Sequence, residues 1–454
     1  MMISEQTIIA QCTPQGSGAI ALLRLSGTDA IKIADLIAKL PHQQKLMMQA
    51  SHTVHYGHIV SDQEIVDQVM FIIMQAPKTF TGEHVVEITC HNNPFIVDKI
   101  ISLAIKHGAR LAQKGEFAKR AFLNGKIDLI QAEAIDSLIH AHTEQALQKS
   151  LSQLSGSLSH WSIELENKLL KCVAFSEASF EFIDEEMDFA PQIKNELIQI
   201  IDLIDLAQKS HNISQQIKDG LRIAIIGSVN AGKSSLFNAL LNKERAIVTP
   251  IAGTTRDVIE AGIYTKQHYL TLVDTAGLRE TNDEIEAIGI AKSLQEAELA
   301  DIILLTFDTS RQITPAELAV YQEIFIKFKE KIILVANKSD QTNLLNLPSN
   351  FQNIVLVSSQ TKTGLDLLEK EIQTKINLIL SQDSAPFLLN QRQFNVLTSV
   401  RLSIQEILKM LACPEFELIS LHLNEALQIL SNLSGKSVTE KSMDTIFREF
   451  CVGK

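Results

Sequence analysis

Residues 227–234 read Gly-Ser-Val-Asn-Ala-Gly-Lys-Ser and form a complete GxxxxGK[ST] motif. The apolar run 221–226 before the motif predicts a buried strand, and the run 235–241 after it predicts the start of a helix. A strand, a glycine-rich loop and a helix in this order direct backbone N–H groups and a helix N-terminus at one point, which favours bound phosphate. The motif therefore predicts a parallel α/β domain that binds a nucleotide.

The residue types of this loop suggest which residues contact the phosphates and which bind the metal ion. We expect Lys233 to reach the β- and γ-phosphates and the hydroxyl of Ser234 to bind Mg²⁺. The loop residues predicted to contact the nucleotide are Asn230, Ala231, Gly232, Lys233, Ser234 and Ser235.

A second motif, Asn337-Lys338-Ser339-Asp340, follows the apolar run 332–336 and predicts which base is bound. The carboxylate of Asp340 can accept hydrogen bonds from N1–H and the exocyclic amine of guanine. Adenine lacks that pair of donors, and an unpaired carboxylate would cost about 1–3 kcal/mol. Asn337, Lys338 and Asp340 are therefore predicted to bind GTP, and Ser358 and Ser359, after the run 354–357, are predicted to form a second base-binding loop.

The remaining elements of a GTP site lie between these two motifs. Asp274-Thr275-Ala276-Gly277 follows the run 269–273, where Asp274 would orient Mg²⁺ through water and the N–H of Gly277 would contact the γ-phosphate. In the polar loop 253–257 we choose Thr255 as the residue that completes the Mg²⁺ shell. Four phosphate, metal and base elements thus occur in the order of a GTP-binding domain.

Catalysis must depart from the Ras-like pattern, in which a glutamine after the DTAG motif orients the attacking water. Leu278 stands at that position and cannot polarise water. The residues alone leave several alternatives open: Arg256 or Arg279 as a finger, Glu286 as a water-orienting carboxylate, or a monovalent cation. The cation would be held by the side chain of Asn230 and by carbonyl groups of the loop 249–254.

Motifs outside this region identify a family. They are Gln11-Cys12-Thr13-Pro14, Leu22-Leu23-Arg24-Leu25-Ser26-Gly27, Thr81-Gly82-Glu83, Gly115-Glu116-Phe117, Arg120-Ala121-Phe122-Leu123-Asn124-Gly125-Lys126, Gln131-Ala132-Glu133-Ala134 and the last four residues, Cys451-Val452-Gly453-Lys454. Together with the GTP motifs they make the chain resemble, nearly end to end, the MnmE (TrmE) family of tRNA-modification GTPases. Generic GTPases lack both ends of this pattern.

The resemblance implies roles for particular residues. By position, Asn230, Thr249, Ile251 and Thr254 match the family's potassium ligands, and Ser234 and Thr255 match its Mg²⁺ ligands. Glu286 matches its catalytic carboxylate. Arg24, Glu87, Lys126 and Lys454 match positions that bind a 5-formyl- or 5,10-methylene-tetrahydrofolate, and Cys451 would belong to the modification centre. GTP-binding roles are implied for Thr249, Thr254, Thr255, Asp274, Thr275, Ala276 and Gly277.

The resemblance also implies an activity and partners. The expected enzyme is a potassium-dependent, homodimeric GTPase that works with a flavoprotein, MnmG (GidA). Together they would add a carboxymethylaminomethyl-type group to C5 of the wobble uridine, position 34, of certain tRNAs, with the folate as one-carbon donor. The alternative is a regulatory GTPase in ribosome assembly or signalling, whose motifs between residues 227 and 359 would look the same. Such a protein would be expected to carry a basic RNA-binding appendage, and none is evident.

The predicted architecture is a multidomain α/β and α protein. An N-terminal α+β domain that binds tetrahydrofolate and dimerises spans 1–118, a helical domain occupies 119–216 and 380–454, and a Ras-like P-loop GTPase domain, 217–379, is inserted into it. About seventy residues after the GTPase region bury little core alone, so packing them onto the earlier helices explains both helical segments.

Composition sets outer limits on this interpretation. The net charge of −12 arises largely in residues 121–216, with 6 Lys/Arg against 15 Asp/Glu, and it argues against tight nonspecific binding to RNA phosphates. No apolar run approaches the roughly 18 residues of a membrane span. The start, Met1-Met2-Ile3-Ser4-Glu5, has no basic segment of a secretion signal. Five dispersed cysteines make no CxxC pair, and for four of them, all but Cys451, we expect reduced thiols in a cytoplasmic protein.

Overall fold

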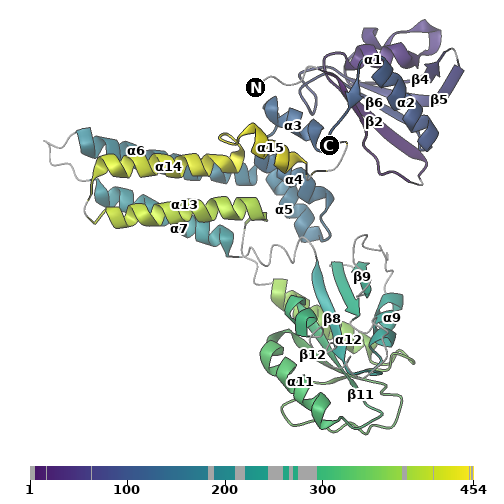
Figure 1. Ribbon diagram of the computed structural model, residues 1–454, viewed down its shortest axis with the longest axis vertical. Helices are drawn as coiled ribbons and strands as arrows, with labels where there is room; N and C mark the ends of the chain where they lie inside the picture. Colours follow the sequence, from purple (N-terminus) through teal and green to yellow (C-terminus); the bar gives the residue numbers. More distant parts are fainter. Residues whose placement is uncertain are drawn as a thin grey trace. The chain divides into compact units, whose positions relative to one another are not determined.

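The computed structural model describes residues 6–16, 18–62, 64–181, 189–209, 220–243, 259–264, 269–274, 294–380, 386–412, 414–448, 450 and 453 (Figure 1). Its contacts divide the chain into two compact units. The first unit comprises Met1–Asp136, Leu151–Ile200 and Asn395–Lys454, and the second comprises Ser137–Ser150 and Ile201–Phe394. The predicted domain boundaries, which separate the N-terminal region from the helices, stay a prediction.

The elements of the first unit come from three separate stretches of the chain. Its strands are β1 (Ile8–Gln11), β2 (Ile20–Ser26), β3 (Ala38–Lys39), β4 (Thr53–Ser61), β5 (Glu64–Met74), β6 (Val85–His91) and β7 (Arg110–Leu111). Its helices are α1 (Ala30–Ile37), α2 (Pro94–Lys106), α3 (Glu116–Leu123), α6 (Ser157–Glu181), α14 (Phe416–Ser434) and α15 (Glu440–Phe447). Helices α4 (Leu129–Ile139), α5 (Glu144–Leu154), α7 (Ala190–Gln208) and α13 (Gln391–Met410) run across the division between the two units.

The seven strands form one sheet in the order β3-β4-β5-β6-β2-β1-β7. Neighbouring strands are antiparallel except β1 and β7. Alternate residues of β2, such as Leu23 and Leu25, face a core shared with α1 and α2, because successive side chains of a strand point to opposite faces. Arg24, between them, therefore projects from the other face.

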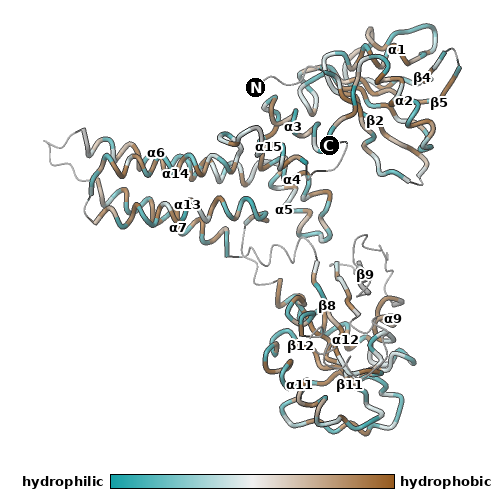
Figure 2. Tube along the Cα trace, viewed as in Figure 1, coloured by the Kyte–Doolittle hydropathy of each residue, from teal (hydrophilic) through white to brown (hydrophobic). Residues whose placement is uncertain are grey.

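The late helices of the first unit pack against the early ones. Helix α14 lies along α6, and the hydroxyl of Ser176 on α6 donates to the carbonyl of Phe416 at the start of α14. Buried residues recur on α14 every three or four positions, which is the stripe of an amphipathic helix, and brown and teal alternate along it in Figure 2. Gly435, with φ 90°, ends this helix. Met443 and Phe447 of α15 pack on Ala118 and Leu129.

The second unit holds a six-stranded sheet in the order β13-β12-β11-β8-β10-β9, in which β9 alone is antiparallel to its neighbour. Its strands are β8 (Leu221–Gly227), β9 (Ile259–Tyr264), β10 (Tyr269–Asp274), β11 (Ile302–Asp308), β12 (Ile332–Asn337) and β13 (Val355–Leu356). Its helices include α9 (Lys233–Lys243), α11 (Pro315–Phe328) and α12 (Leu365–Leu380).

Helices cover both faces of this sheet. On one face α9 and α12 pack against residues such as Ile223 and Ile225 of β8. On the other, α11 packs against the alternate residues Ala224 and Ile226. Because the central strands are buried on both sides, they read as continuous apolar runs rather than as alternating ones. The fold class expected from the sequence is confirmed: an N-terminal mixed α/β region, a helical region and a P-loop GTPase-like sheet.

Within the described residues, no helix combines the length and the apolar character needed to cross a membrane.

Candidate functional site

The phosphate loop leaves β8 at Gly227 and enters α9 at Lys233, two residues before the predicted helix start. Asn230 has φ 64° and Gly232 has φ 84°, so both adopt left-handed backbone. A Cβ on Gly232 would collide with Nδ2 of Asn337, which leaves room only for glycine. The buried side chain of Lys233 donates to the carbonyls of Gly227 and Ser228, both at 2.8 Å. The lysine thus lies across the loop that the sequence predicts to hold phosphates.

The side chain of Asn337 joins the phosphate loop to the loop after β13. Its Nδ2 donates to the carbonyls of Ala231, at 3.1 Å, and Gly232, at 3.3 Å. Its Oδ1 accepts from the N–H and the hydroxyl of Ser359, at 3.1 and 2.9 Å. A buried amide normally satisfies its polar atoms, and Asn337 does so by connecting three segments that the sequence predicts to bind GTP.

The carboxylate of Asp340 is exposed and is oriented from one side. The hydroxyl of the buried Ser358 donates to its Oδ1 at 2.5 Å. The same hydroxyl oxygen accepts from the N–H of Thr361 at 3.1 Å. The structure therefore brings Ser358, Ser359, Asn337 and Asp340 together at the ends of β12 and β13, with Asp340 exposed to solvent.

Lys338 is anchored by a charge that the sequence analysis did not single out. Its ammonium group lies 2.7 Å from Oδ2 of Asp308, at the end of β11. Burial of Asp308 opposes ionisation, but hydrogen bonds from Lys338 and Ser310 outweigh it and lower the pKa of the carboxyl. Lys338 has φ 64°, and the hydroxyl of Thr309 lies 2.8 Å from its carbonyl oxygen. These contacts hold the predicted base-binding motif at the carboxyl end of β12.

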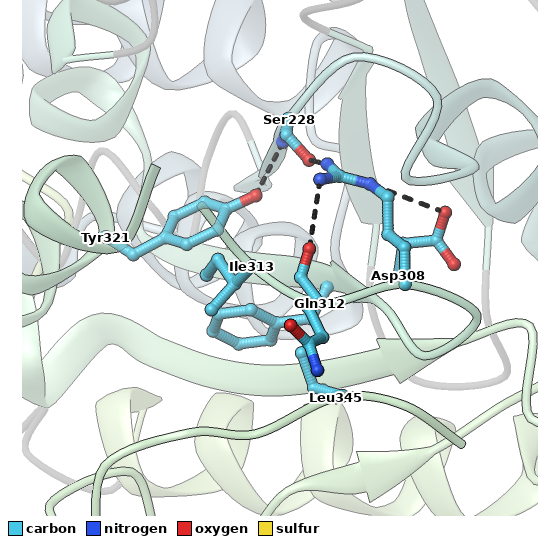
Figure 3. A pocket seen from close by; sticks show the side chains of 8 residues that line it. Ser228, Asp308, Gln312, Ile313, Tyr321 and Leu345 are labelled. Carbon is cyan, nitrogen blue, oxygen red and sulfur yellow. Dashed lines mark hydrogen bonds and ion pairs between the residues drawn. The ribbon is translucent and has the colours of Figure 1, made fainter. Parts of the chain in front are cut away.

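The sequence motifs also do not predict a polar network that contacts Ser228 of the phosphate loop. Arg311 and Tyr321 contact Ser228, and Figure 3 shows these side chains around a small pocket lined also by Asp308, Gln312, Ile313 and Leu345. The only sequence signal near them is Thr314-x-x-Glu317, a capping box that marks the start of α11. That motif predicts a helix start and says nothing about a tertiary contact.

The motifs of the N-terminal region gather around β2 and β6. The guanidinium of Arg24 pairs with the carboxylate of Glu87 at 2.7–2.8 Å and lies over the ring of Phe117. It also donates to the carbonyl of Gly453 at 3.3 Å, and the thiol of Cys12 contacts that oxygen at 3.2 Å. A residue next to the C-terminus is thereby held beside two residues from the start of the chain.

The predicted folate residue Lys126 lies beside the Thr81-Gly82-Glu83 loop. A Cβ built on Gly82 would stand 3.4 Å from Cγ of Lys126 and 3.2 Å from Cβ of Asn124. The amide of Asn124 donates to the carbonyl of Thr81 at 2.7 Å. The Thr81-Gly82-Glu83 loop therefore packs on the segment that carries Lys126.

A buried ion network ties helix α3 to the sheet. Arg120, whose side chain is 3% exposed, donates to both carboxylate oxygens of Glu83 at 3.0–3.1 Å and to Glu116 at 3.1 Å. It also donates to the carbonyl of Gln6 at 2.9 Å. Glu116 is further bound by Arg110; burial opposes ionisation, yet this bond keeps the pKa of Glu116 below its usual value. Glu83 in turn accepts from Ser26, two residues from Arg24 along β2.

Several predicted site residues lie outside the described residues: Thr249, Ile251, Thr254, Thr255, Thr275, Ala276, Gly277, Glu286, Cys451 and Lys454. Asp274 is described as the last residue of β10, where it pairs with Ile225 of β8. Asn230, Ser234 and Ser235 are exposed on the loop and the first turn of α9.

Comparison with known proteins decides the family. A model of the GTP-binding protein TrmE N-terminus matches residues 7–126, and a model of the MnmE helical domain matches residues 129–451. The chain belongs to the MnmE family. The resemblance found in the sequence is thereby confirmed over nearly the whole chain.

Individual MnmE relatives match at full length. The tRNA modification GTPase MnmE of Lachnoclostridium phytofermentans is 39% identical over 465 residues, covering 100% of both chains. The protein of the same name from Aquifex aeolicus is 39% identical over 458 residues, covering 99% of this chain and 100% of that one. Among solved structures, the G domain of the T. maritima FeoB iron transporter matches 34% of this chain and 98% of its own, with 25% identity and a TM-score of 0.26.

Proposed function

We propose that this MnmE-family chain is a GTP-hydrolysing enzyme of tRNA modification. The observation that carries the proposal is the side chain of Asn337, which joins the phosphate loop to the predicted base-binding loop beside an exposed Asp340 oriented by Ser358. Such a link suits a ligand that has both phosphates and a base. The full-length relatives, named tRNA modification GTPases, supply the process in which the hydrolysis is used.

The metal ligands would come from the first turn of α9, the end of β10 and the loops between them. Ser234 stands in the first turn of α9, and Asp274 ends β10 beside the strand that leads into the phosphate loop. Hydroxyl and carboxylate oxygens are suitable ligands for Mg²⁺, so Ser234 would bind it directly, Asp274 through water, and Thr255 would complete the shell. Magnesium neutralises developing charge on the phosphates when it is bound. Asn230, Thr249, Ile251 and Thr254 would hold potassium, and Glu286 would orient the attacking water.

GTP turnover is expected to be about 10- to 100-fold faster in K⁺ than in Na⁺ at equal ionic strength, because a fitted cation stabilises transition-state charge in place of a finger. The measurement is steady-state phosphate release by the whole chain in each salt. Asn230→Ala should abolish the difference while GTP still binds. Equal rates in both salts for the unmodified chain would refute the cation-assisted mechanism.

The N-terminal site would bind a tetrahydrofolate. The carboxylate of Glu87 suits the amidine-like edge of a pterin, and Arg24, Lys126 and Lys454 supply cations for a glutamate tail. Cys451 would lie at the modification centre, since Gly453, two residues beyond it, contacts Arg24 and Cys12. With a flavoprotein partner, MnmG, a homodimer would transfer the one-carbon unit to C5 of uridine 34 of a tRNA. Nucleotide-dependent ordering of loops would open and close the paired GTPase domains.

Gly453→Ala is expected to reduce tRNA modification at least about tenfold while GTP turnover stays unchanged, because left-handed backbone disfavours a Cβ. Gly453 has φ 94°, and its added Cβ would stand 2.7 Å from Cα of Cys12 and 2.9 Å from the carbonyl oxygen of Gln11. The measurement is the modified-uridine content of tRNA from cells that depend on the variant. Gly108→Ala is the matched control, because Gly108 has φ 106° and nothing within 4 Å. Normal modification by Gly453→Ala would exclude a role for the docked tail.

A further inference from the structure

Ser228, the second residue of the phosphate loop, is held from behind by two side chains (Figure 3). Its N–H donates to the hydroxyl of Tyr321 at 2.6 Å, and its own hydroxyl oxygen accepts from Nη2 of Arg311 at 2.8 Å. The hydroxyl of Tyr321 donates onward to the carbonyl of Thr306, on β11, at 3.3 Å. Since Lys233 donates to the carbonyl of Ser228, the N–H, the carbonyl and the hydroxyl of Ser228 are each engaged by a side chain.

Both holding side chains are themselves fixed. Tyr321 is 4% exposed, and its ring meets that of Phe307 edge to face, with centroids 4.8 Å apart. Arg311 forks onto both carboxylate oxygens of Glu317, at 2.6 and 3.0 Å. Hydrogen bonds from Arg311 hold the pKa of Glu317 at about 2, so the carboxylate stays charged at neutral pH. Glu317 also closes the capping box with Thr314, which fixes it to the start of α11.

These contacts fix the backbone and side chain of Ser228, within the loop that is predicted to bind phosphates. Ser228 lies two residues before Asn230, whose left-handed backbone directs the turn of the loop. The contacts to Ser228 border a small pocket. If the polar contacts were lost, the loop would sample other conformations, and apparent affinity falls in proportion to the fraction of molecules that remain competent.

We propose that Arg311 and Tyr321, steadied by Glu317, are positioning residues that preset the phosphate loop of this protein for the phosphates of its nucleotide. The inference rests on the proposed GTP-binding function and adds to it a group of residues outside the motifs. Neither side chain needs to touch the ligand, because each acts through Ser228.

Tyr321→Phe tests the half of the network that acts on the backbone. It keeps the ring but leaves the N–H of Ser228 without its acceptor, so GDP and GTP affinity should fall about tenfold. Binding is measured with a fluorescent GDP analogue and by competition with GTP, using the full chain. The melting temperature should fall further in saturating GDP than without nucleotide, so the rise produced by GDP should shrink.

Two variants, Arg311→Lys and Ser228→Ala, test the hydrogen bond between Arg311 and the side chain of Ser228. Lysine keeps the charge of Arg311 but lacks the guanidinium that reaches Glu317 and Ser228 together, and alanine removes the hydroxyl of Ser228 that accepts from Arg311. Each single variant should therefore weaken GDP binding about three- to tenfold. The double variant should be no weaker than either single one, since both changes remove the same hydrogen bond. Additive losses would show that Arg311 does not act through Ser228.

Lys327→Gln is the matched control. Lys327 lies on the same helix, α11, and the change breaks an exposed ion pair with Glu298. Neither residue belongs to the Ser228 network, so the affinity for GDP should not change. Unchanged GDP affinity in Tyr321→Phe and Arg311→Lys would overturn this inference alone. An equal fall in melting temperature with and without GDP would also overturn it, by showing a purely structural role. Failure of the unmodified chain to bind GTP would overturn both the inference and the proposed function.

Discussion

Asp340→Asn is expected to weaken GTP binding at least about 100-fold and to allow xanthosine triphosphate to bind in its place. The carboxylate of Asp340 would accept from two donors of guanine. Asparagine offers one acceptor and one donor, so its amide would face the exocyclic amine of guanine, donor against donor. Xanthine carries a carbonyl there and would pair with the amide. The hydroxyl of Ser358, bound to Oδ1, orients the side chain for this choice.

The measurement is competition of GTP, ATP and xanthosine triphosphate against a fluorescent GDP analogue, and against a fluorescent xanthosine analogue for the variant. Glu330 is an exposed carboxylate of the same unit, and the control variant Glu330→Gln should bind these nucleotides as the unmodified chain does. If Asp340→Asn retained its preference for GTP, Asp340 would not recognise the base. Equal binding of ATP and GTP by the unmodified chain would point instead to an ATPase.

Arg120→Met is expected to destabilise the first unit by about 3–5 kcal/mol, because it leaves the carboxylate of Glu83 without a cation, close to a Glu116 that keeps only Arg110. Arg120 is 3% exposed at its side chain and binds Glu83, Glu116 and the carbonyl of Gln6. The change is measured by urea unfolding of the full chain, followed by the fluorescence of Trp161, the single tryptophan, which lies in α6 of the same unit.

Two further variants separate the charge effect from packing. Adding Glu83→Gln to Arg120→Met should restore part of the lost stability, since Glu116 keeps its pair with Arg110 and Glu83 no longer carries an uncompensated charge. Lys409→Met breaks an ion pair with Glu406 whose side chains are 71% and 68% exposed, and it should cost below about 0.5 kcal/mol. If Arg120→Met cost no more than Lys409→Met, the buried network would contribute nothing to stability.

Much of the fold follows from local signals. The apolar runs next to the motifs became β8, β10 and β12, because strands covered on both faces need uninterrupted apolar residues. The short strands β3 and β7 were not predicted, since two residues carry no periodicity. Strand β11 was not singled out either; its sequence is apolar, but no motif follows it.

The candidate sites divide in the same way. The phosphate loop, Asn337 and Asp340 belong to motifs whose spacing reflects their chemistry, and the structure brings the loop, Asn337, Asp340 and Ser359 together. Arg311, Tyr321 and Asp308 act through contacts between segments far apart in the chain, which no local pattern encodes. The meeting of Cys12 with Gly453 spans 441 positions and follows only from the folded chain.

The carboxamide of Asn337 has a consequence for how a ligand is recognised as a whole. Its nitrogen and its oxygen are each committed to a different loop, so displacing either loop removes partners from the same buried carboxamide. Under the proposed function, a ligand that orders one loop would also order the carboxamide shared with the other, so binding at the two ends would be cooperative. A nucleoside without its phosphates, or pyrophosphate without a nucleoside, forgoes that cooperativity as well as the missing contacts.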